Sequence, residues 1–139
     1  MLWGVFWALI IIPLVVVFGY LPFTEGEANK KYVPELRKIA DQTPLYPGFQ
    51  KIGEWVVLKR DMVCFSTSYK SDAQLEDVKA FYMRELPVKG WTPPKPPSTS
   101  VIEFDSHRGS YRRGDYFLDL HQDGREPNNF SIVFIWDPQ

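Results

Sequence analysis

The chain has 139 residues, of which 45% are hydrophobic and 24% charged, and this length leaves room for one compact domain. Sixteen basic and seventeen acidic residues give a formal net charge of -1, so no overall field would attract nucleic acid or an acidic substrate. The one cysteine, Cys64, excludes an intramolecular disulfide. Aromatic residues make up 16% of the chain, which is enough apolar bulk for a core without disulfides.

The charges are unevenly placed, because none occurs before Glu25. Residues 1–24 are almost entirely apolar, and at 1.5 Å per residue the first twenty would span roughly 30 Å, the thickness of a bilayer's hydrocarbon core. We expect an uncleaved transmembrane anchor rather than a signal peptide, because a positive n-region and a small-x-small cleavage site are both missing. Aromatic side chains near both ends suit the membrane interface, and membrane helices tolerate a central proline. The side chains expected to contact lipid or other helices are Trp3, Phe6, Trp7, Pro13, Phe18 and Tyr20.

Residues 25–49 follow as a connector between the anchor and the remaining chain. Pro34 suits the first turn of a short helix, because its missing N–H would have no partner there. Leu36 and Ile39 then fall on one side of that helix. We therefore expect a connector that contains one short helix, followed by a globular domain over residues 50–139.

Residues 50–139 alternate between strand-like and helical patterns. Ser71-Asp72-Ala73-Gln74 has the form of a capping box, and apolar residues recur at helical spacing from Leu75 to Leu86. Segments rich in β-branched and aromatic residues predict strands on both sides of this helix, the first two joined by a tight turn at Arg60-Asp61. The predicted strands cover residues 51–59, 62–69, 101–105, 111–122 and 130–136, and a proline-rich stretch covers 92–98.

The order β-β-α-β-β-β predicts an α+β domain. An antiparallel sheet of about four or five strands can bury one face under an amphipathic helix and leave the other face open. We expect the helix over residues 75–86 to be the one that covers the sheet. Functional residues would then lie on the open face, in the loops or in the anchor.

The helix-to-strand region carries a resemblance. Phe81-Tyr82, Leu86 and Gly90-Trp91 form the pattern Phe-Tyr-x3-Leu-x3-Gly-Trp, and Arg113-Gly114-Asp115-Tyr116 follows further on. This half of the chain resembles small bacterial membrane-anchored or lipoprotein-like domains that have no assigned chemistry. The resemblance implies a helix-on-sheet module outside the cytoplasm and implies no functional residue.

The side of the membrane is predicted differently by two signals. Four basic residues within the twenty positions after the anchor, and none before it, favour a cytoplasmic domain by charge bias. The resemblance favours an extracytoplasmic domain. We expect a single-pass protein of the cell membrane with its globular domain on the periplasmic side. The four basic residues are Lys30, Lys31, Arg37 and Lys38.

Asp119, His121 and Asp123 are the sharpest chemical candidates. They alternate along one predicted strand, so their side chains share a face, and carboxylate with imidazole is a usable ligand set for zinc or manganese. The alternative is the solvated face of a strand whose Leu118 and Leu120 point inward. The alternative is favoured, because a closed metal site also needs ligands from other elements. We therefore expect no metal and no other cofactor.

Three other motifs are weaker. Asp105-Ser106-His107 contains hydrolase residue types, but neighbours in a strand point to opposite faces. Cys64 with His107 or His121 would make a thiol site, but a cysteine in an apolar strand is usually an inert core residue. Arg113-Gly114-Asp115 matches an adhesion tripeptide that recurs by chance. These patterns do not predict catalysis.

Arg108, Arg112 and Arg113 form the one tight basic cluster, which would suit lipid headgroups or an acidic partner. A solvated turn is the alternative. Together these features predict a non-enzymatic, membrane-anchored accessory or stabilising subunit of a larger membrane complex, of respiratory or photosynthetic type. The alternatives are a membrane-tethered binding module for a lipid or peptide, and a metal-dependent enzyme using Asp119 and His121. We expect neither a nucleic-acid partner nor an obligatory small-molecule substrate.

Overall fold

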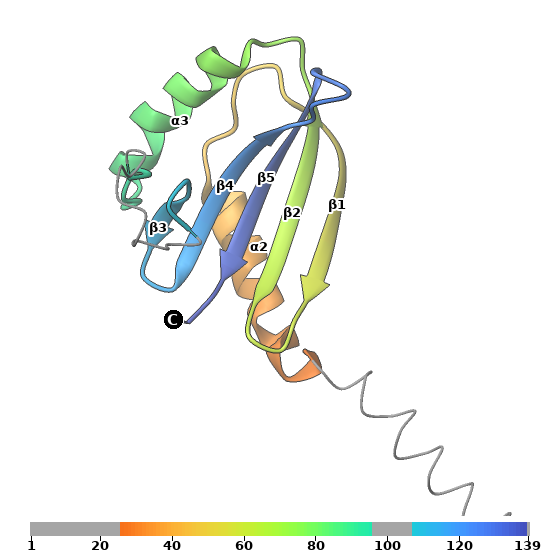
Figure 1. Ribbon diagram of the computed structural model, residues 1–139, viewed down its shortest axis with the longest axis vertical. Helices are drawn as coiled ribbons and strands as arrows, with labels where there is room; N and C mark the ends of the chain where they lie inside the picture. The colour runs from red at the N-terminus through yellow and green to blue at the C-terminus, as the bar shows by residue number, and fades with distance from the viewer. Residues whose placement is uncertain (1–25, 96–106, 139) are drawn as a thin grey trace, which may run out of the picture.

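The computed structural model describes residues 26–95 and 107–138. Its sheet has five strands in the order β1-β2-β5-β4-β3, and every neighbouring pair is antiparallel (Figure 1). The α+β class and the antiparallel sheet are therefore confirmed. The elements are η1 (Glu27–Tyr32), α2 (Val33–Gln42), β1 (Gln50–Leu58), β2 (Val63–Lys70), α3 (Leu75–Val88), β3 (Tyr111–Arg113), β4 (Tyr116–Gln122) and β5 (Asn129–Trp136).

Two predicted elements lie outside the described residues: the anchor over 1–24, with all six of its named side chains, and the strand over 101–105. Among the described helices, none is long and apolar enough to cross a membrane. The hairpin predicted over 51–59 and 62–69 is confirmed by the pairing of β1 with β2, whose bounds differ from the prediction by one residue at each end.

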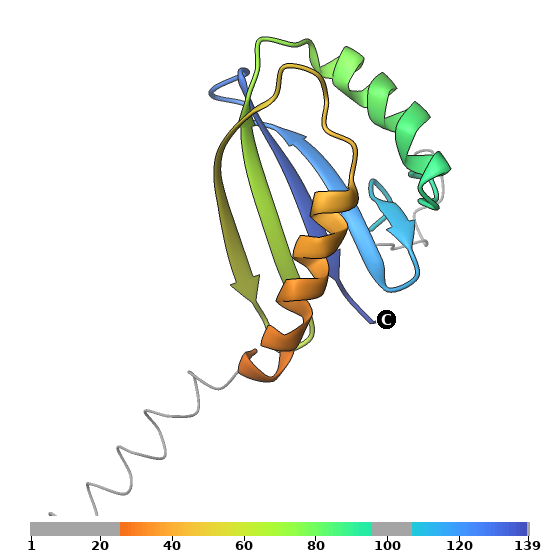
Figure 2. The same cartoon turned by 180° about the vertical axis from the view of Figure 1, so that it is seen from behind.

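The core lies on one face of the sheet. Phe65 in β2 and Phe134 in β5 pair across the two central strands, and both are buried there. Leu36 and Ile39 of α2 pack onto this face and are themselves buried. Figure 2 shows α2 crossing the middle of the sheet, and Figure 1 shows the opposite face without a helix over it. Two-residue periodicity in the strands explains why a single face is apolar.

The helix over the middle of the sheet is α2, not the helix predicted over 75–86. That second helix exists as α3, but it lies toward the β3 and β4 side of the molecule (Figure 2). It buries Val78, Tyr82 and Leu86, a single row at every fourth position, in the same core. The expectation of one covering helix was therefore wrong, since a short helix in the predicted connector packs on the sheet as well.

The strand predicted over 111–122 is a hairpin. Gly114 has φ 62, and Arg113 pairs directly with Tyr116 across the two-residue loop Gly114-Asp115. A positive φ at the first loop position is the geometry of a type II′ turn, which needs glycine there. The prediction of a single strand over residues 111–122 was therefore wrong. The apolar and polar alternation continues through the turn, so it gives no sign that the strand is interrupted there.

Candidate functional site

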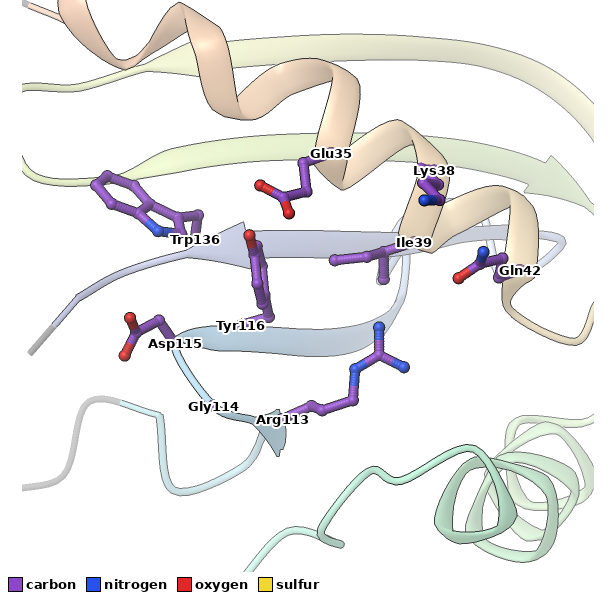
Figure 3. Close-up of a pocket in the computed structure, with 9 residues that line it drawn as sticks. All are labelled: Glu35, Lys38, Ile39, Gln42, Arg113, Gly114, Asp115, Tyr116 and Trp136. Atoms are coloured by element: carbon purple, nitrogen blue, oxygen red, sulfur yellow. The ribbon is translucent and has the colours of Figure 1, made fainter.

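An open groove lies between α2 and the β3–β4 hairpin (Figure 3). Its volume is about 450 Å³. One wall is helical and the other is formed by the hairpin and the end of β5, so residues far apart in sequence meet here. We call it the α2 groove, and the residues that line it are Glu35, Lys38, Ile39, Gln42, Arg113, Gly114, Asp115, Tyr116 and Trp136.

Tyr116 stands in the middle of the α2 groove. Burial and a hydrogen bond with Glu35 raise the pKa of its hydroxyl to about 12. Figure 3 shows this hydroxyl directed toward the Glu35 carboxylate. The phenol is neutral at physiological pH, and its O–H donates a hydrogen bond to the Glu35 carboxylate, which joins α2 to β4 across the floor of the groove.

Arg113 separates the α2 groove from a second hollow. Its guanidinium lies over the Trp91 ring, 4.7 Å from the ring centroid, and its Nη1 donates to the Lys89 carbonyl at 3.2 Å. The second hollow, of about 410 Å³, shares Ile39, Gln42 and Arg113 with the first. Figure 3 shows the Arg113 side chain extending from β3 toward α2. The guanidinium is thus held at the boundary of both hollows.

The α2 groove carries side chains that suit binding. Lys38, Gln42 and Arg113 offer donors for a carboxylate, a phosphate or a peptide carbonyl. No serine, cysteine or histidine is among the described residues that line it. Sequence patterns did not single out Glu35, Lys38 or Gln42, although their helical spacing is a signal that they share one side of α2.

The predicted metal candidates lie on and just after β4. Asp119 Oδ2 and His121 Nε2 are 3.9 Å apart on the face opposite α2, and Asp119 also accepts a hydrogen bond from Ser110. Asp123 lies beyond the strand, where its Oδ1 accepts a hydrogen bond from the Arg125 N–H at 2.8 Å. In residues 26–95 and 107–138 no group of three or more His, Cys, Asp or Glu side chains is placed to hold a metal ion.

The predicted basic cluster is divided between two faces. Arg112 lies over Phe117 at 5.4 Å and donates from Nε to the Gly114 carbonyl, whereas Arg113 lies over Trp91. Adjacent residues of β3 point to opposite sides of the sheet, so these two arginines do not share one surface. Arg108 lies in the preceding loop, half-buried, where its carbonyl accepts a hydrogen bond from Lys95 N–H.

The side chain of His107 packs against its neighbours in the fold. Its ring stacks on Phe117 with 3.8 Å between centroids, and its Nε2 lies 2.7 Å from Asp137 Oδ2. These contacts tie the segment before β3 to the end of β5. The other two residues of Asp105-Ser106-His107, which the sequence did not favour as a hydrolase site, lie outside the described residues.

Cys64 is half-buried in β2, and burial raises the pKa of its thiol. A raised pKa keeps the sulfur protonated at neutral pH, and the protonated form is a poor nucleophile and a poor metal ligand. These properties agree with an inert packing residue. They give no support to a thiol site.

β1 is an exposed apolar edge strand. It is nine residues long and pairs on one side only, with β2. Trp55 is 49% exposed and Ile52 is 55% exposed, and Val56 and Val57 are exposed as well. The Gln50 end of β1 carries Lys51, Glu54 and a β-bulge between Lys51 and Gly53, which protect an edge against further pairing. The apolar stretch from Trp55 to Val57 suits protein contacts.

No family model, curated protein or solved structure matches this chain. The strand pairing establishes the fold class, and the resemblance stated for residues 72–116 stays a prediction. Within residues 26–95 and 107–138, the fold is therefore a small α+β domain whose helices cover one face of the sheet and whose edge strand β1 exposes apolar side chains.

Proposed function

We propose that this protein is a non-enzymatic, single-pass accessory subunit that stabilises a larger membrane protein complex, with a respiratory or photosynthetic complex as the type of host. The observation that carries the proposal is the apolar segment over residues 1–24, which contains no Asp, Glu, Lys or Arg. Its length suits one passage through a bilayer. A tether of this kind places the domain beside other membrane subunits.

The exposed edge of β1 supports protein contacts. Val56 lies on the helix-covered side of the sheet opposite Phe65, whereas Trp55 and Val57 lie on the other side opposite Ser66 and Cys64. Apolar side chains are thus exposed on both sides of the same edge. A neighbouring subunit that pairs with β1 would bury the exposed apolar side chains on both sides of this edge.

The test is extraction of the native membrane with a mild detergent, affinity capture of the chain and mass spectrometry of the captured proteins. A stoichiometric set of membrane subunits is expected. A variant without residues 1–24 should lose these subunits while its domain still unfolds cooperatively in urea. Recovery of the full chain alone, at the size of a monomer, would contradict the proposal.

The side of the membrane is tested separately. We propose a periplasmic domain, and a membrane-impermeant reagent should then modify a cysteine placed at exposed Gln50 in intact cells. Modification only after the cells are opened would place the domain in the cytoplasm and leave the subunit proposal standing.

A membrane-tethered peptide-binding module is the second candidate, and the α2 groove favours it. The groove is open, and polar donors lie beside Ile39 and Trp136, which suits an extended peptide. A photo-cross-linking amino acid in place of Gln42 should capture a peptide segment that the same probe at Gln50 does not. Equal capture at both positions would argue against the groove.

A further inference from the structure

Gly26, the first residue that the structure describes, packs against the end of β1. Gly26 has φ 95, and a Cβ at this position would lie 3.0 Å from the backbone carbon of Leu58. Both the positive φ and the close approach require glycine. Gly26, where the described fold begins, is therefore fixed at the Leu58 end of the sheet.

η1 is fixed to the same end. Asn29 Nδ2 donates to the carbonyl oxygens of Lys59 at 2.9 Å and Arg60 at 2.8 Å, in the turn between β1 and β2. Tyr32, at the other end of η1, stacks on Trp136 with 3.7 Å between ring centroids. Figure 1 shows η1 beside this turn. The first described turn of the chain thus has a fixed place on the sheet.

These contacts join two basic pairs that are distant in sequence. The residues are Lys30 and Lys31 in η1 and Lys59 and Arg60 in the turn, and all four are exposed. Glu27 and Asp61 are the acidic residues of the same two segments, which leaves an excess of positive charge. We call this end the basic tip, formed by η1 and residues 59–61.

The opposite end of the sheet carries acidic and basic side chains in similar number. Ser71 N–H donates to the Asn128 carbonyl at 2.8 Å, which joins the segment after β2 to the loop between β4 and β5 (Figure 1). This end contains Asp72, Asp123 and Glu126 against Lys70 and Arg125. The Leu58 end of the sheet also carries Asp115 and Asp137, next to β4 and β5, so the excess of positive charge belongs to the basic tip itself.

We propose that the basic tip lies on the anionic headgroups of the membrane and holds the domain upright on the bilayer. This inference rests on the proposed anchor over residues 1–24. A residue spans at most about 3.6 Å, so two residues, Glu25 and Gly26, allow at most about 7 Å between the tip and the end of the proposed anchor. That distance is inside the Debye length of about 8 Å at physiological salt, so the headgroup charge acts on the tip.

The test uses the full chain in nanodiscs of phosphatidylcholine, and in nanodiscs in which about a third of the lipid is phosphatidylglycerol. A water-soluble amine-reactive ester modifies exposed lysines, and mass spectrometry of the peptides gives the rate at each position. Lys30 and Lys59 should react at least about fivefold more slowly on the anionic lipid, the effect expected for one basic side chain near such a surface. Lys70, at the opposite end, should react equally on both.

Two matched double variants isolate the charge effect. Lys59→Gln with Arg60→Gln should remove most of the protection of Lys30, whereas Lys70→Gln with Arg125→Gln removes the same charge and should leave that protection unchanged. Asn29→Ala keeps all the charges but separates η1 from the turn, and it should weaken the protection of Lys30. Salt at about 1 M shortens the Debye length to about 3 Å and should abolish the difference between the lipids.

Three outcomes would overturn the inference. Equal rates on both lipids, in a chain that has entered the nanodiscs, would reject the basic tip and leave the anchor standing. Protection by inorganic phosphate on neutral nanodiscs would indicate a phosphate site instead of a lipid surface. A chain that does not enter nanodiscs at all would contradict the anchor itself. Incorporation into the nanodiscs is therefore measured before the lysines are labelled.

Discussion

At the scale of single residues, Tyr116 illustrates how the structure changes ordinary side-chain chemistry. Partial burial and the hydrogen bond with Glu35 raise the pKa of its hydroxyl from the ordinary value of 10.0 to about 12. Nothing in the pattern of the strand distinguishes this tyrosine from Tyr111 or Tyr69. Its role in the α2 groove depends on α2, which lies far from it in sequence.

This shift predicts a loss of stability in alkali. A folded-state pKa above the unfolded value stabilises the fold fully below pH 10, and this contribution is lost as the pH rises toward 12. In Tyr116→Phe, the free energy of unfolding should fall less steeply over this pH range than in the parent chain. Part of the slope should remain, because burial also raises the pKa of Tyr82 and Tyr111. Urea unfolding of both chains in detergent measures the two slopes, and identical slopes would contradict the assignment.

Cys64 gives a second prediction at this scale. Because burial raises the pKa of its thiol, a disulfide reagent at pH 8 should react with the folded chain several-fold more slowly than with the chain in urea. The absorbance of the released thiolate measures both rates. Equal rates would mean that water reaches this side chain freely.

At the scale of elements, the β3–β4 turn depends on one glycine conformation. Gly114 has φ 62, and a Cβ added there would meet no heavy atom within 4 Å, so only its backbone angle resists substitution. Gly114→Ala should cost about 1 kcal/mol of unfolding free energy. Gly124→Ala is the matched control, since Gly124 has equal space and an ordinary φ, and it should cost little. Equal losses in thermal unfolding would contradict this explanation.

α2 is the second element whose importance can be measured. Leu36 is completely buried between α2 and the sheet, whereas Val88 at the end of α3 is 82% exposed. Leu36→Ala should lower the free energy of unfolding by about 2–5 kcal/mol, the usual cost of a large buried aliphatic side chain. Val88→Ala should change it by less than about 0.5 kcal/mol. A small effect of Leu36→Ala would show that α2 is not part of the core.

At the scale of the whole molecule, both helices and the sheet share one core. Leu36 of α2, Tyr82 of α3 and Phe134 of β5 belong to the same buried cluster. Helical circular dichroism and tryptophan fluorescence should therefore report the same urea midpoint. Separate midpoints would show that α2 or α3 unfolds independently of the sheet.

The distribution of charge also belongs to the whole molecule. Composition alone, at a net charge of -1, excludes a strong overall field, and it says nothing about polarity along the molecule. Asn29 and the Ser71–Asn128 contact fix which charged segments meet at each end. The sequence pointed to Lys30 and Lys31 as a signal for membrane orientation. It did not connect them with Lys59 and Arg60.

The sequence by itself determined the features that depend on local periodicity and composition. Alternating β-branched and aromatic residues predicted β2 and β5, helical spacing predicted α3, and the absence of charge before Glu25 predicted the anchor. These signals are local, because each depends on neighbours within a few residues. The α+β class followed from their order along the chain.

The tertiary structure decided what depends on contacts between distant segments. It placed α2 over the sheet, turned residues 111–122 into a hairpin at Gly114, and put Arg112 and Arg113 on opposite faces. It also formed the α2 groove and the basic tip, each from segments that no spacing rule connects. The shared core decides which surfaces meet. Every helix and strand must bury its apolar face in that core at the same time, and few packing arrangements of the elements allow this.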